Sequence, residues 1–370
     1  MHTFQYQNRL AGVRSWISAN PDIHAVLITH LEHVGYISGF SGSNGIVIVT
    51  QDRAWFVTDG RYRLQTSTEV TGFEIEIFGQ SVLLVESAKL LNAAGFTGGL
   101  AIESAYMSVD GYNTLVATLH PGITLTPSNG VVEAVKAIKE PAEIDAIRQA
   151  CALVDDACAH IIDIVRIGMT EAELAWKIEV YVRERGATRM GFDSIIGSGP
   201  NAAIIHGRAG NRGIGSSGEA EFLLCDFGCE INGYNSDITR TFVVGGAPTE
   251  RMQHMYDTVY AAQDAACNAI KPGIAGQKID ALSRAILSDA GYGNMPHNLG
   301  HGLGRLVHDA SGLLSPASKL TLHENVVLTV EPGIYIPGYG AVRIEDDVLV
   351  TANGFERLTQ FSRDLVVIGG

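Results

Sequence analysis

Two segments of this 370-residue chain place acidic residues inside stretches that otherwise have the pattern of buried β-strands. The first segment contains Asp226 and Asp237, and the second, about 105 residues further along the chain, contains Glu331 and Glu345. In each segment an apolar strand leads to an acidic residue and a glycine-rich turn, and the returning strand carries the second acidic residue. An unpaired carboxylate is costly to bury, so we expect a positively charged group to lie between these four side chains.

Three histidines, His297, His301 and His308, lie between the two acidic segments. The glycines among them let the backbone approach a bound group closely. Four carboxylates with one or two imidazoles form a ligand set for a pair of divalent cations, and the imidazole favours Mn²⁺, Co²⁺ or Zn²⁺ over Mg²⁺ or Ca²⁺. Taken singly, an acidic turn residue or a core histidine is the more ordinary explanation. The metal hypothesis therefore depends on the joint pattern.

The elements around these residues predict an α+β architecture for the second part of the chain. If Gly233 and Asn235 help to form the bend of the first segment, its two acidic side chains converge on one face, and the second segment repeats this arrangement. Helical patterns near residues 250–270 and 276–291 lie between the two predicted hairpins. We therefore expect an antiparallel sheet of two similar halves, backed by helices.

The N-terminal third of the chain has a different pattern. Strand-like runs such as NGIVIVT alternate with helical patterns such as residues 8–20, which predicts a smaller α/β domain. A charged connector follows, and Pro141 fits the first residue of a long helix. We therefore expect an N-terminal domain over residues 1–135 and a catalytic domain over residues 136–370.

Composition narrows the possible partners and the compartment. The chain has 40 acidic and 26 basic residues, and its net charge of −14 disfavours nucleic acid or an anionic membrane as a partner. No apolar run is long enough to span a bilayer, and the N-terminus lacks the pattern of a signal peptide. The five cysteines are sparse and odd in number, which is typical of a reducing compartment. We expect a cytoplasmic protein.

The acidic and histidine segments also carry a family resemblance that extends over nearly the whole chain. Four of them resemble, in order and spacing, the signature segments of the Xaa-Pro peptidases: DFGCEINGYNSDITRTF, HNLGHGLGRLVHD, TVEPGIYIPG and RIEDDVLVT. This is the aminopeptidase P and prolidase group of pita-bread metallopeptidases. VGYISGFSGSNGIVIVT resembles the family's non-catalytic, creatinase-like first domain, and IKEPAEIDAIRQA its domain junction. The resemblance implies a dinuclear metal hydrolase that cleaves before proline.

Position by position, the resemblance implies five metal ligands: Asp226, Asp237, His301, Glu331 and Glu345. Asp237 and Glu345 would bridge both ions. Asp226 would hold one ion, and His301 with Glu331 would hold the other. A pair of Mn²⁺ ions is the expected cofactor, with Co²⁺ or Zn²⁺ as alternatives because the same ligands serve all three.

The resemblance also implies roles for residues around the ligands. Glu331 is the expected acid–base partner of the attacking water. His206 and His308 match histidines that stabilise the tetrahedral oxyanion and pass a proton to the leaving proline nitrogen. The expected substrate-binding residues are His297, Tyr335 and Arg343, together with the same two histidines, His206 and His308.

Two further residues are expected outside the coordination sphere. Arg343, two positions before Glu345, would orient either Asp226 or Glu345. Thr239 would support a bridging carboxylate in the same way.

The chain departs from the family pattern after its last signature histidine. Many prolidases have HEAPR there, and that arginine is thought to bind the free carboxylate of an Xaa-Pro dipeptide. This chain has HDASG, which places Ser311 and Gly312 at the proline and arginine positions. Losing a charge-assisted contact costs a dipeptide about 1.5–3 kcal/mol of binding, whereas longer peptides do not need it. Arg305, Arg208 or Arg212 could substitute for it.

This departure favours an Xaa-Pro aminopeptidase, and an Xaa-Pro dipeptidase (prolidase) is the alternative. The expected substrates are peptides with proline at the second position, and the family's dimers imply a homodimer. A peptide-binding relative without catalysis is the rival from another class, but such a protein should have lost ligands, and all five are present. The same argument disfavours creatinase-like chemistry, and the N-terminal domain disfavours a methionine aminopeptidase.

Overall fold

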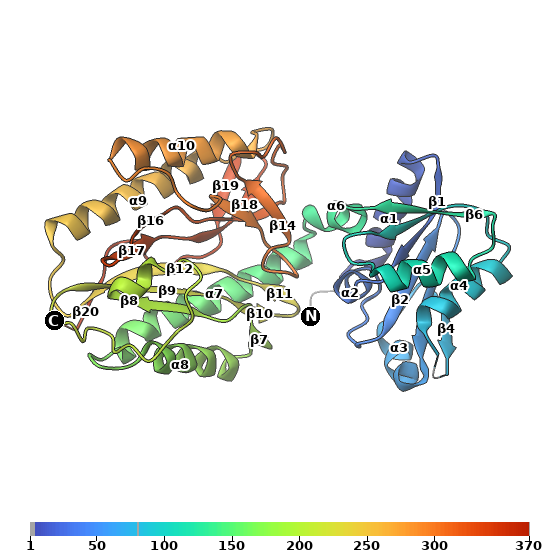
Figure 1. Cartoon of the computed structure of the whole chain (residues 1–370), viewed down its shortest axis with the longest axis horizontal. Coiled ribbons are helices and arrows are strands. Elements are labelled where there is room, and N and C mark those ends of the chain that lie inside the picture. The colour runs from blue at the N-terminus through green and yellow to red at the C-terminus, as the bar shows by residue number, and fades with distance from the viewer. Residues whose placement is uncertain (1–3, 80, 370) are drawn as a thin grey trace. The chain divides into compact units, whose positions relative to one another are not determined.

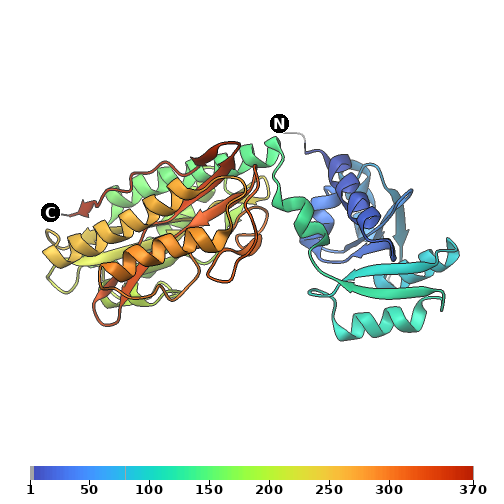
Figure 2. The same cartoon turned by 90° about the horizontal axis from the view of Figure 1, so that it is seen from above.

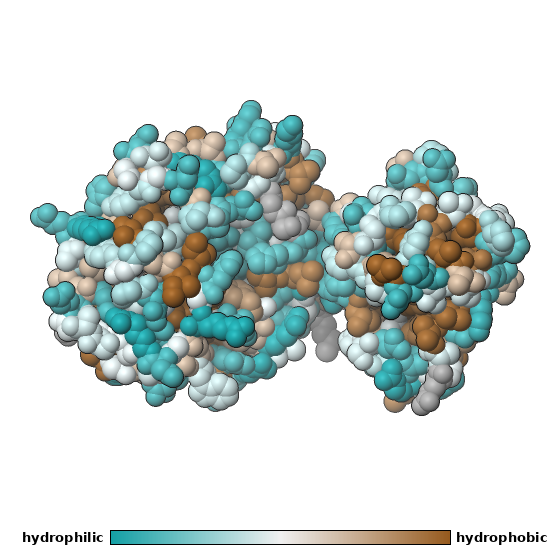
Figure 3. Space-filling model, viewed as in Figure 1, coloured by the Kyte–Doolittle hydropathy of each residue, from teal (hydrophilic) through white to brown (hydrophobic). Residues whose placement is uncertain are grey.

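A computed structural model describes residues 4–79 and 81–369, and it describes residues 310–312 without their side chains. The described residues form two compact units, 4–136 and 137–369 (Figure 1). On the face seen in Figure 3, apolar side chains are scattered among polar ones in both units, as is usual for a protein surface. Within the described ranges, no helix has both the length and the apolar character needed to cross a bilayer.

The first unit contains one six-stranded mixed sheet, ordered β4-β3-β2-β1-β5-β6. Its strands are β1 (Ile23–Ile28), β2 (Gly45–Thr50), β3 (Ala54–Asp59), β4 (Glu74–Phe78), β5 (Gly98–Glu103) and β6 (Ile123–Ser128). The pairs β1–β2 and β2–β3 are antiparallel, and the other neighbours are parallel. The strand expected at NGIVIVT is confirmed as β2.

Alternate side chains of these strands face two separate hydrophobic layers. Val26 and Val47 pack with helices on one face, and Leu27 and Ile48 pack with helices on the other. The helices of this unit are α1 (Tyr6–Ala19), α2 (Leu31–Ser38), α3 (Arg63–Glu69), α4 (Leu83–Ala93), α5 (Val109–Thr118) and α6 (Val131–Ala137), with the short helix η1 (Gly60–Tyr62). The unit is therefore an α/β sandwich of three layers, as the sequence predicts.

The second unit contains two main sheets between two pairs of helices. One sheet has the order β20-β12-β9-β8, and the other has the order β14-β13-β15-β18-β19. The strands of these sheets are β8 (Ile195–Ser198), β9 (Glu221–Phe227), β12 (Ile238–Val244), β13 (Gly300–Gly302), β14 (Ala310–Leu314), β15 (Val327–Val330), β18 (Asp346–Thr351), β19 (Gly354–Arg357) and β20 (Val367–Ile368). A single antiparallel bridge between Thr239 and Glu345 joins the two sheets.

Four long helices cover the sheets: α7 (Pro141–Ile164), α8 (Glu171–Glu184), α9 (Glu250–Ala269) and α10 (Gly276–Asp289). In Figure 1, α7 and α8 lie on one side of the sheets, and α9 and α10 lie on the other. Figure 2 shows α9 and α10 running side by side. The α+β class is confirmed, and Pro141 begins α7 as predicted. The expected single sheet is instead two sheets, and β12–β20 is a parallel pair.

Each acidic segment is a nested pair of strands rather than a simple hairpin. Between β9 and β12 lie β10 (Cys229–Ile231) and β11 (Tyr234–Asn235), and between β15 and β18 lie β16 (Gly333–Ile336) and β17 (Gly340–Arg343). The short strand β7 (Arg189–Met190) pairs with β10, and the short helix η2 (Gly199–Ala203) follows β8.

The bend of the first nested pair is made by Asn232 and Gly233, which have φ values of 54° and 79°. These left-handed conformations favour asparagine and glycine at the tip of a tight hairpin. The expectation for Gly233 is therefore confirmed, but that for Asn235 is wrong. The Asn235 side chain instead donates to the carbonyl oxygen of Arg305 at 2.9 Å, which ties the hairpin to the histidine segment.

Candidate metal centre and active site

The five predicted metal ligands come from strands or strand ends of the second unit. Asp226 lies in β9 and His301 in β13; Asp237 and Glu345 directly precede β12 and β18; and Glu331 directly follows β15. All five line one pocket of about 920 Å³. Side chains distributed over more than 100 residues of sequence are therefore brought to one site by the pairing of the strands.

The distances within this group are short enough for shared ligands. Asp237, His301 and Glu345 each offer one donor atom, and these atoms lie within 4.8 Å of one another. The Nε2 atom of His301 lies 3.6 Å from Oδ2 of Asp237 and 3.5 Å from Oε1 of Glu331. An ion at this position would touch imidazole and carboxylate ligands from both main sheets.

The protein alone neutralises these carboxylates only in part, through an ion pair between Arg343 and Asp226. Burial, followed by repulsion from Glu345, raises the pKa of Asp237 well above its usual value, and burial and Glu345 do the same for Glu331. Burial raises the pKa of Glu345 to about 8, and it also raises the pKa of Asp226. The Oδ1 atoms of Asp226 and Asp237 are buried without a hydrogen-bond partner. The site therefore fits a pair of cations, which would supply the missing positive charge.

His301 has the protonation state that a metal ligand needs. Burial, with the nearby His308, lowers the pKa of His301 to about 4, so its ring is neutral near pH 7. The Nδ1 atom lies 3.1 Å from the carbonyl oxygen of Gly302, a contact in which Nδ1 donates. The lone pair of Nε2 then points toward the carboxylates. A backbone carbonyl behind the ring is a common way of fixing a histidine ligand.

Close packing of the glycine-rich segment holds His301 near Glu331. A Cβ atom on Gly300 would lie 1.9 Å from the carbonyl oxygen of Thr329, so a side chain there would push β13 away from β15. The Oγ1 atom of Thr329 accepts from the backbone N–H of His301 at 3.1 Å and donates to Oε1 of Glu331 at 3.3 Å.

Arg343 connects the two carboxylates that it was expected to orient. Its Nη2 atom donates to Oδ2 of Asp226, and its Nε atom donates to Oγ1 of Thr239 at 3.0 Å. Thr239 in turn donates to Oε2 of Glu345 at 2.6 Å. Burial would lower the pKa of Arg343, but Tyr335 and Asp226 raise it well above its usual value. Arg343 therefore contacts Asp226 directly and reaches Glu345 through Thr239.

The other predicted residues surround the same pocket. His206, His297 and His308 line it. Tyr335 lies behind it and donates from its hydroxyl to Nε2 of His297 at 2.8 Å, because Nδ1 of that ring donates to the carbonyl oxygen of Asn298. The Tyr335 hydroxyl also accepts from Nη1 of Arg343 at 2.9 Å. Burial lowers the pKa of His297 to about 4, and burial with His206 lowers the pKa of His308. The last two rings are therefore neutral near pH 7.

Of the three arginines considered as substitutes for the missing arginine, Arg208 lines the pocket. Arg212 is paired with Glu221, with 2.7 Å between Nη2 and Oε2. Arg305 lies over the ring of Tyr234. Arg208 is exposed. A guanidinium in a pocket wall is a residue type that can bind a carboxylate through two hydrogen bonds. The side chains of Ser311 and Gly312 lie outside the described residues.

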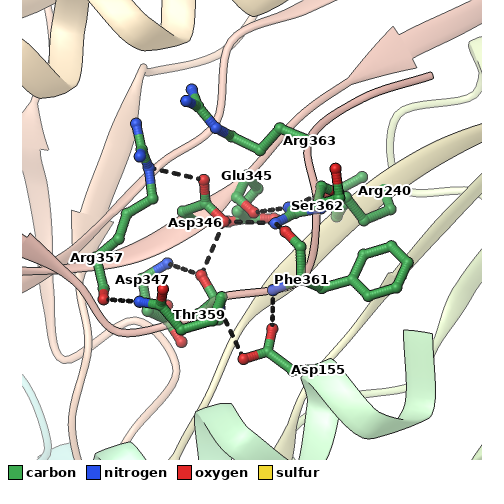
Figure 4. Close-up of polar contacts among 12 residues, drawn as sticks. Asp155, Arg240, Glu345, Asp346, Asp347, Arg357, Thr359, Phe361, Ser362 and Arg363 are labelled. Carbon is green, nitrogen blue, oxygen red and sulfur yellow. Dashed lines mark hydrogen bonds and ion pairs between the residues drawn. The ribbon is translucent and has the colours of Figure 1, made fainter. Parts of the chain in front are cut away.

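Sequence reasoning missed a buried polar network behind the carboxylates (Figure 4). In isolation the RIEDD motif has the pattern of a solvated charge run, yet Asp346 and Asp347 are both fully buried. Oδ2 of Asp347 accepts from the backbone N–H of Asp237 at 2.9 Å and from the Cys151 thiol at 3.2 Å. The apolar strand that continues after the motif was the available signal, because a charged residue inside such a strand is seldom solvated.

Arg240 is the centre of this network (Figure 4). Its Nη2 atom lies 2.6 Å from Oδ1 of Asp346, and its Nη1 atom donates to the carbonyl oxygen of Glu345 at 2.6 Å. Arg240 also donates from Nη2 to the carbonyl oxygen of Phe361 at 2.8 Å and from Nε to that of Ser362 at 3.1 Å. One buried side chain thus ties β12, the start of β18 and the C-terminal segment together.

Comparison with known proteins agrees with this geometry. Residues 145–352 match the model of metallopeptidase family M24, and residues 9–138 match the creatinase/prolidase N-terminal domain. The Xaa-Pro dipeptidase of Pyrococcus furiosus is 35% identical over 97% of this chain and 100% of that protein. A solved Xaa-Pro dipeptidase of Bacillus anthracis has a TM-score of 0.93 at 34% identity, covering 98% of this chain and all of the other.

A solved X-Pro aminopeptidase of Thermotoga maritima is also similar, with a TM-score of 0.86 at 30% identity over 96% of this chain and 99% of the other. The pocket, the two sheets that form it and these matches together confirm the resemblance seen in the sequence. The chain therefore belongs to metallopeptidase family M24, with a creatinase-like N-terminal domain followed by a pita-bread domain.

Proposed function

We propose that this chain is an Xaa-Pro dipeptidase, which hydrolyses the bond between an N-terminal residue and a C-terminal proline. The observation that carries the proposal is the pocket itself. It combines four buried carboxylates and a neutral histidine, which suit two divalent cations, with a cationic side chain, Arg208, which suits a peptide carboxylate. Similarity to Xaa-Pro dipeptidases along nearly the whole chain supports the same activity.

This proposal reverses the order of preference from the sequence. The missing arginine favoured an aminopeptidase, with the dipeptidase as its alternative. The dipeptidase relatives support the alternative better, and Arg208 offers a physical reason, because its guanidinium could bind the substrate carboxylate from another wall of the pocket. The aminopeptidase is kept as a second candidate because the Thermotoga maritima structure is also similar.

The residues of the pocket would have different roles in peptide hydrolysis. Two divalent cations held by the five ligands would polarise the scissile carbonyl and lower the pKa of the attacking water. Glu331, at the edge of the ligand cluster, would take the proton of that water. His206 and His308 would donate hydrogen bonds to the oxyanion and pass a proton to the proline nitrogen, which must be protonated to leave. His297 would hold the substrate against the pocket wall.

The cofactor and the assembly are part of the same proposal. Four carboxylates and one imidazole favour Mn²⁺ for the two positions, with Co²⁺ or Zn²⁺ as competitors. The five cysteines are buried and have free thiols, which agrees with the reducing cytoplasm that we propose. We also propose a homodimer, which light scattering after size-exclusion chromatography would test.

The first experiment compares two substrates under controlled metal loading. The metal-stripped chain is supplied with Mn²⁺, Co²⁺ or Zn²⁺ and assayed with an Xaa-Pro dipeptide and an Xaa-Pro-Yaa tripeptide. We expect metal-dependent cleavage with the higher kcat/KM on the dipeptide. Preference for the tripeptide would identify an aminopeptidase, and inactivity on both substrates with every metal would overturn the proposal.

A substitution tests the role of Arg208 directly. Arg208→Gln should lower kcat/KM for the dipeptide by about 10-fold or more, the equivalent of one charge-assisted hydrogen bond, and should change the tripeptide rate little. Arg212→Gln is the matched control, because Arg212 is paired with Glu221 and is not among the residues that line the pocket. Equal loss on both substrates would contradict a carboxylate-binding role.

A further inference from the structure

A second group of potential metal ligands lies in the first unit, at the start of α2. His30, Glu32 and His33 each offer one donor atom, and these three atoms lie within 4.8 Å of one another. His30 occupies the position just before the helix, and the other two belong to its first turn. The predicted catalytic ligands all belong to the second unit, so this group is separate from them in the chain.

The hydrogen bonds of Glu103 fix the tautomer of His33. Oε2 of Glu103 accepts from the backbone N–H groups of Thr29 at 2.6 Å and His30 at 2.9 Å. Its Oε1 atom lies 2.5 Å from Nδ1 of His33. An ionised carboxylate can only accept, so Nδ1 carries a proton, and in the neutral ring Nε2 presents a lone pair.

That lone pair has no hydrogen-bond partner. His33 is 0% exposed, and its Nε2 atom is buried and unsatisfied. Oε2 of Glu32, which also carries lone pairs, lies 3.5 Å from Nε2 of His33. A lone pair that faces a carboxylate oxygen is unfavourable, and a cation bound between the two atoms would relieve this contact.

His30 adds a second unsatisfied nitrogen to the same place. Its Nδ1 atom is buried without a hydrogen-bond partner. The ring is held by stacking on Tyr106, with centroids 3.9 Å apart, and it meets the ring of His33 edge-on at 4.8 Å. Both buried nitrogens, Nδ1 of His30 and Nε2 of His33, therefore lack a hydrogen-bond partner within the described residues.

The side chains around this group carry a net negative charge that a bound cation would balance. Glu32 and Glu103 contribute two negative charges, and Lys136, with Nζ 2.7 Å from Oε2 of Glu32, contributes one positive charge. With both imidazoles neutral, the group carries one net negative charge. Lys136 also positions the Glu32 carboxylate, as an outer partner commonly does for a metal ligand.

We propose that His30, Glu32 and His33 bind one divalent cation of the Zn²⁺ type, with Glu103 orienting His33 from behind. Two imidazole nitrogens and one carboxylate oxygen are a recurrent Zn²⁺ ligand set that leaves a fourth position for water. A carboxylate behind a histidine ligand is the usual outer partner in such sites. Zn²⁺ bonds of about 2.0–2.2 Å place neighbouring ligand atoms closer together than 4.8 Å, so binding draws the three side chains inward.

This site would stabilise the start of α2. His30 lies between β1 and α2, whereas Glu32 and His33 lie in the first turn of α2. Glu103 lies at the end of β5, and Lys136 lies in α6. An ion bound only by the folded chain raises stability in proportion to the logarithm of its concentration. The proposed ion would therefore stabilise the fold of the first unit. Its binding does not depend on the hydrolytic activity proposed above.

The test counts the metal bound by the full chain. The chain carrying Asp226→Asn and Asp237→Asn, which weaken the catalytic cluster, is dialysed against Zn²⁺, and bound zinc is measured by mass spectrometry. We expect one zinc that is lost when either His33→Asn or Glu32→Gln is added. His120→Asn is the matched control in the same unit, because His120 lies outside the group and caps its own turn.

A second measurement avoids all substitutions. Crystals of the unsubstituted chain, soaked in Zn²⁺, should show an anomalous peak at the zinc edge bonded to Nδ1 of His30, Nε2 of His33 and the Glu32 carboxylate. No peak there, together with the same bound zinc before and after His33→Asn, would overturn the proposal. Those results would mean that hydrogen bonds, ion pairs and ring contacts hold these three side chains together without a metal ion.

Discussion

At the scale of single residues, Arg343 carries contacts that few side chains could replace. Its guanidinium donates in three directions, to Asp226, Thr239 and Tyr335, with a planar geometry that a lysine ammonium does not share. Thr239 in turn donates a hydrogen bond to Glu345. The Arg343 guanidinium therefore orients two predicted metal ligands, Asp226 directly and Glu345 through Thr239.

Arg343→Lys should therefore lower Mn²⁺ affinity and kcat/KM by about 10–100-fold, the usual effect of losing an outer partner of metal ligands. Mn²⁺ titration by calorimetry and an Xaa-Pro hydrolysis assay would measure the two quantities. Arg189→Lys is the matched control, because the Arg189 side chain is 59% exposed and pairs with Glu230, which is not among the residues that line the pocket. Wild-type affinity in Arg343→Lys would contradict the assigned role.

The buried carboxylates also predict how pH affects the metal-free chain. The folded pKa of Glu345 is about 8, above its ordinary value of 4.5, so the folded state binds more protons than the unfolded state between these pH values. The free energy of unfolding should then fall by a few kcal/mol as the pH rises from about 4.5 to 8. Urea denaturation of the metal-stripped chain at several pH values measures this.

Two controls isolate the cause of that pH dependence. Glu345→Gln removes one of the buried titrating carboxylates and should make the fall in stability smaller, because Asp237 and Glu331 also have raised pKa values. Saturating Mn²⁺ should restore stability at pH 8 by neutralising the carboxylates. A metal-free chain that is equally stable at pH 5 and pH 8 would show that the carboxylates do not repel one another as the structure implies.

At the scale of elements, Arg240 joins segments that are far apart in sequence. It connects β12 to the start of β18 and to the segment before β20 (Figure 4). Burial would raise the pKa of Asp346, but Arg240 outweighs it and lowers that pKa below the usual value. The pair therefore remains ionised inside the unit.

Arg240→Leu would leave Asp346 buried beside a weaker set of partners, so we expect a loss of about 3–5 kcal/mol in the free energy of unfolding. Arg148→Leu is the control: its ion pair with Glu356 is exposed, and such pairs contribute about 0–1 kcal/mol. Chemical denaturation of both variants makes the comparison. Equal losses of free energy of unfolding in the two variants would mean that the buried Arg240–Asp346 pair stabilises the fold no more than an exposed pair does.

At the scale of the whole molecule, each unit has hydrophobic clusters of its own. The clusters of the first unit use residues up to Val135, and the two large clusters of the second begin at Ala150. All of the residues that line the 920 Å³ pocket lie between Gly191 and Glu345.

The fragment 137–370 should therefore fold by itself and keep the catalytic cation pair. We expect a cooperative thermal transition by circular dichroism and two Mn²⁺ ions bound per chain. The same fragment with Asp237→Asn is the control for specific binding. A fragment without a cooperative transition would mean that the core of the second unit depends on the first.

The sequence by itself determined the features that rest on local signals. Pro141 predicted the start of α7, Gly233 predicted a tight turn, and apolar runs predicted the strands. The acidic and histidine residues were found because charged side chains in apolar segments are conspicuous, and their spacing carried the family resemblance, which the comparisons confirm.

The tertiary structure alone decided which residues meet. In the structure the hairpins are nested, and Asp346 and Asp347 are buried. Arg208 lines the pocket, whereas Arg212 and Arg305 do not. Glu103 contacts His33, although 70 residues separate them in the sequence. Local propensity specifies a turn or a strand, but strand order and register decide which distant side chains share a site. Those depend on packing across the whole unit, which no short segment of the sequence contains.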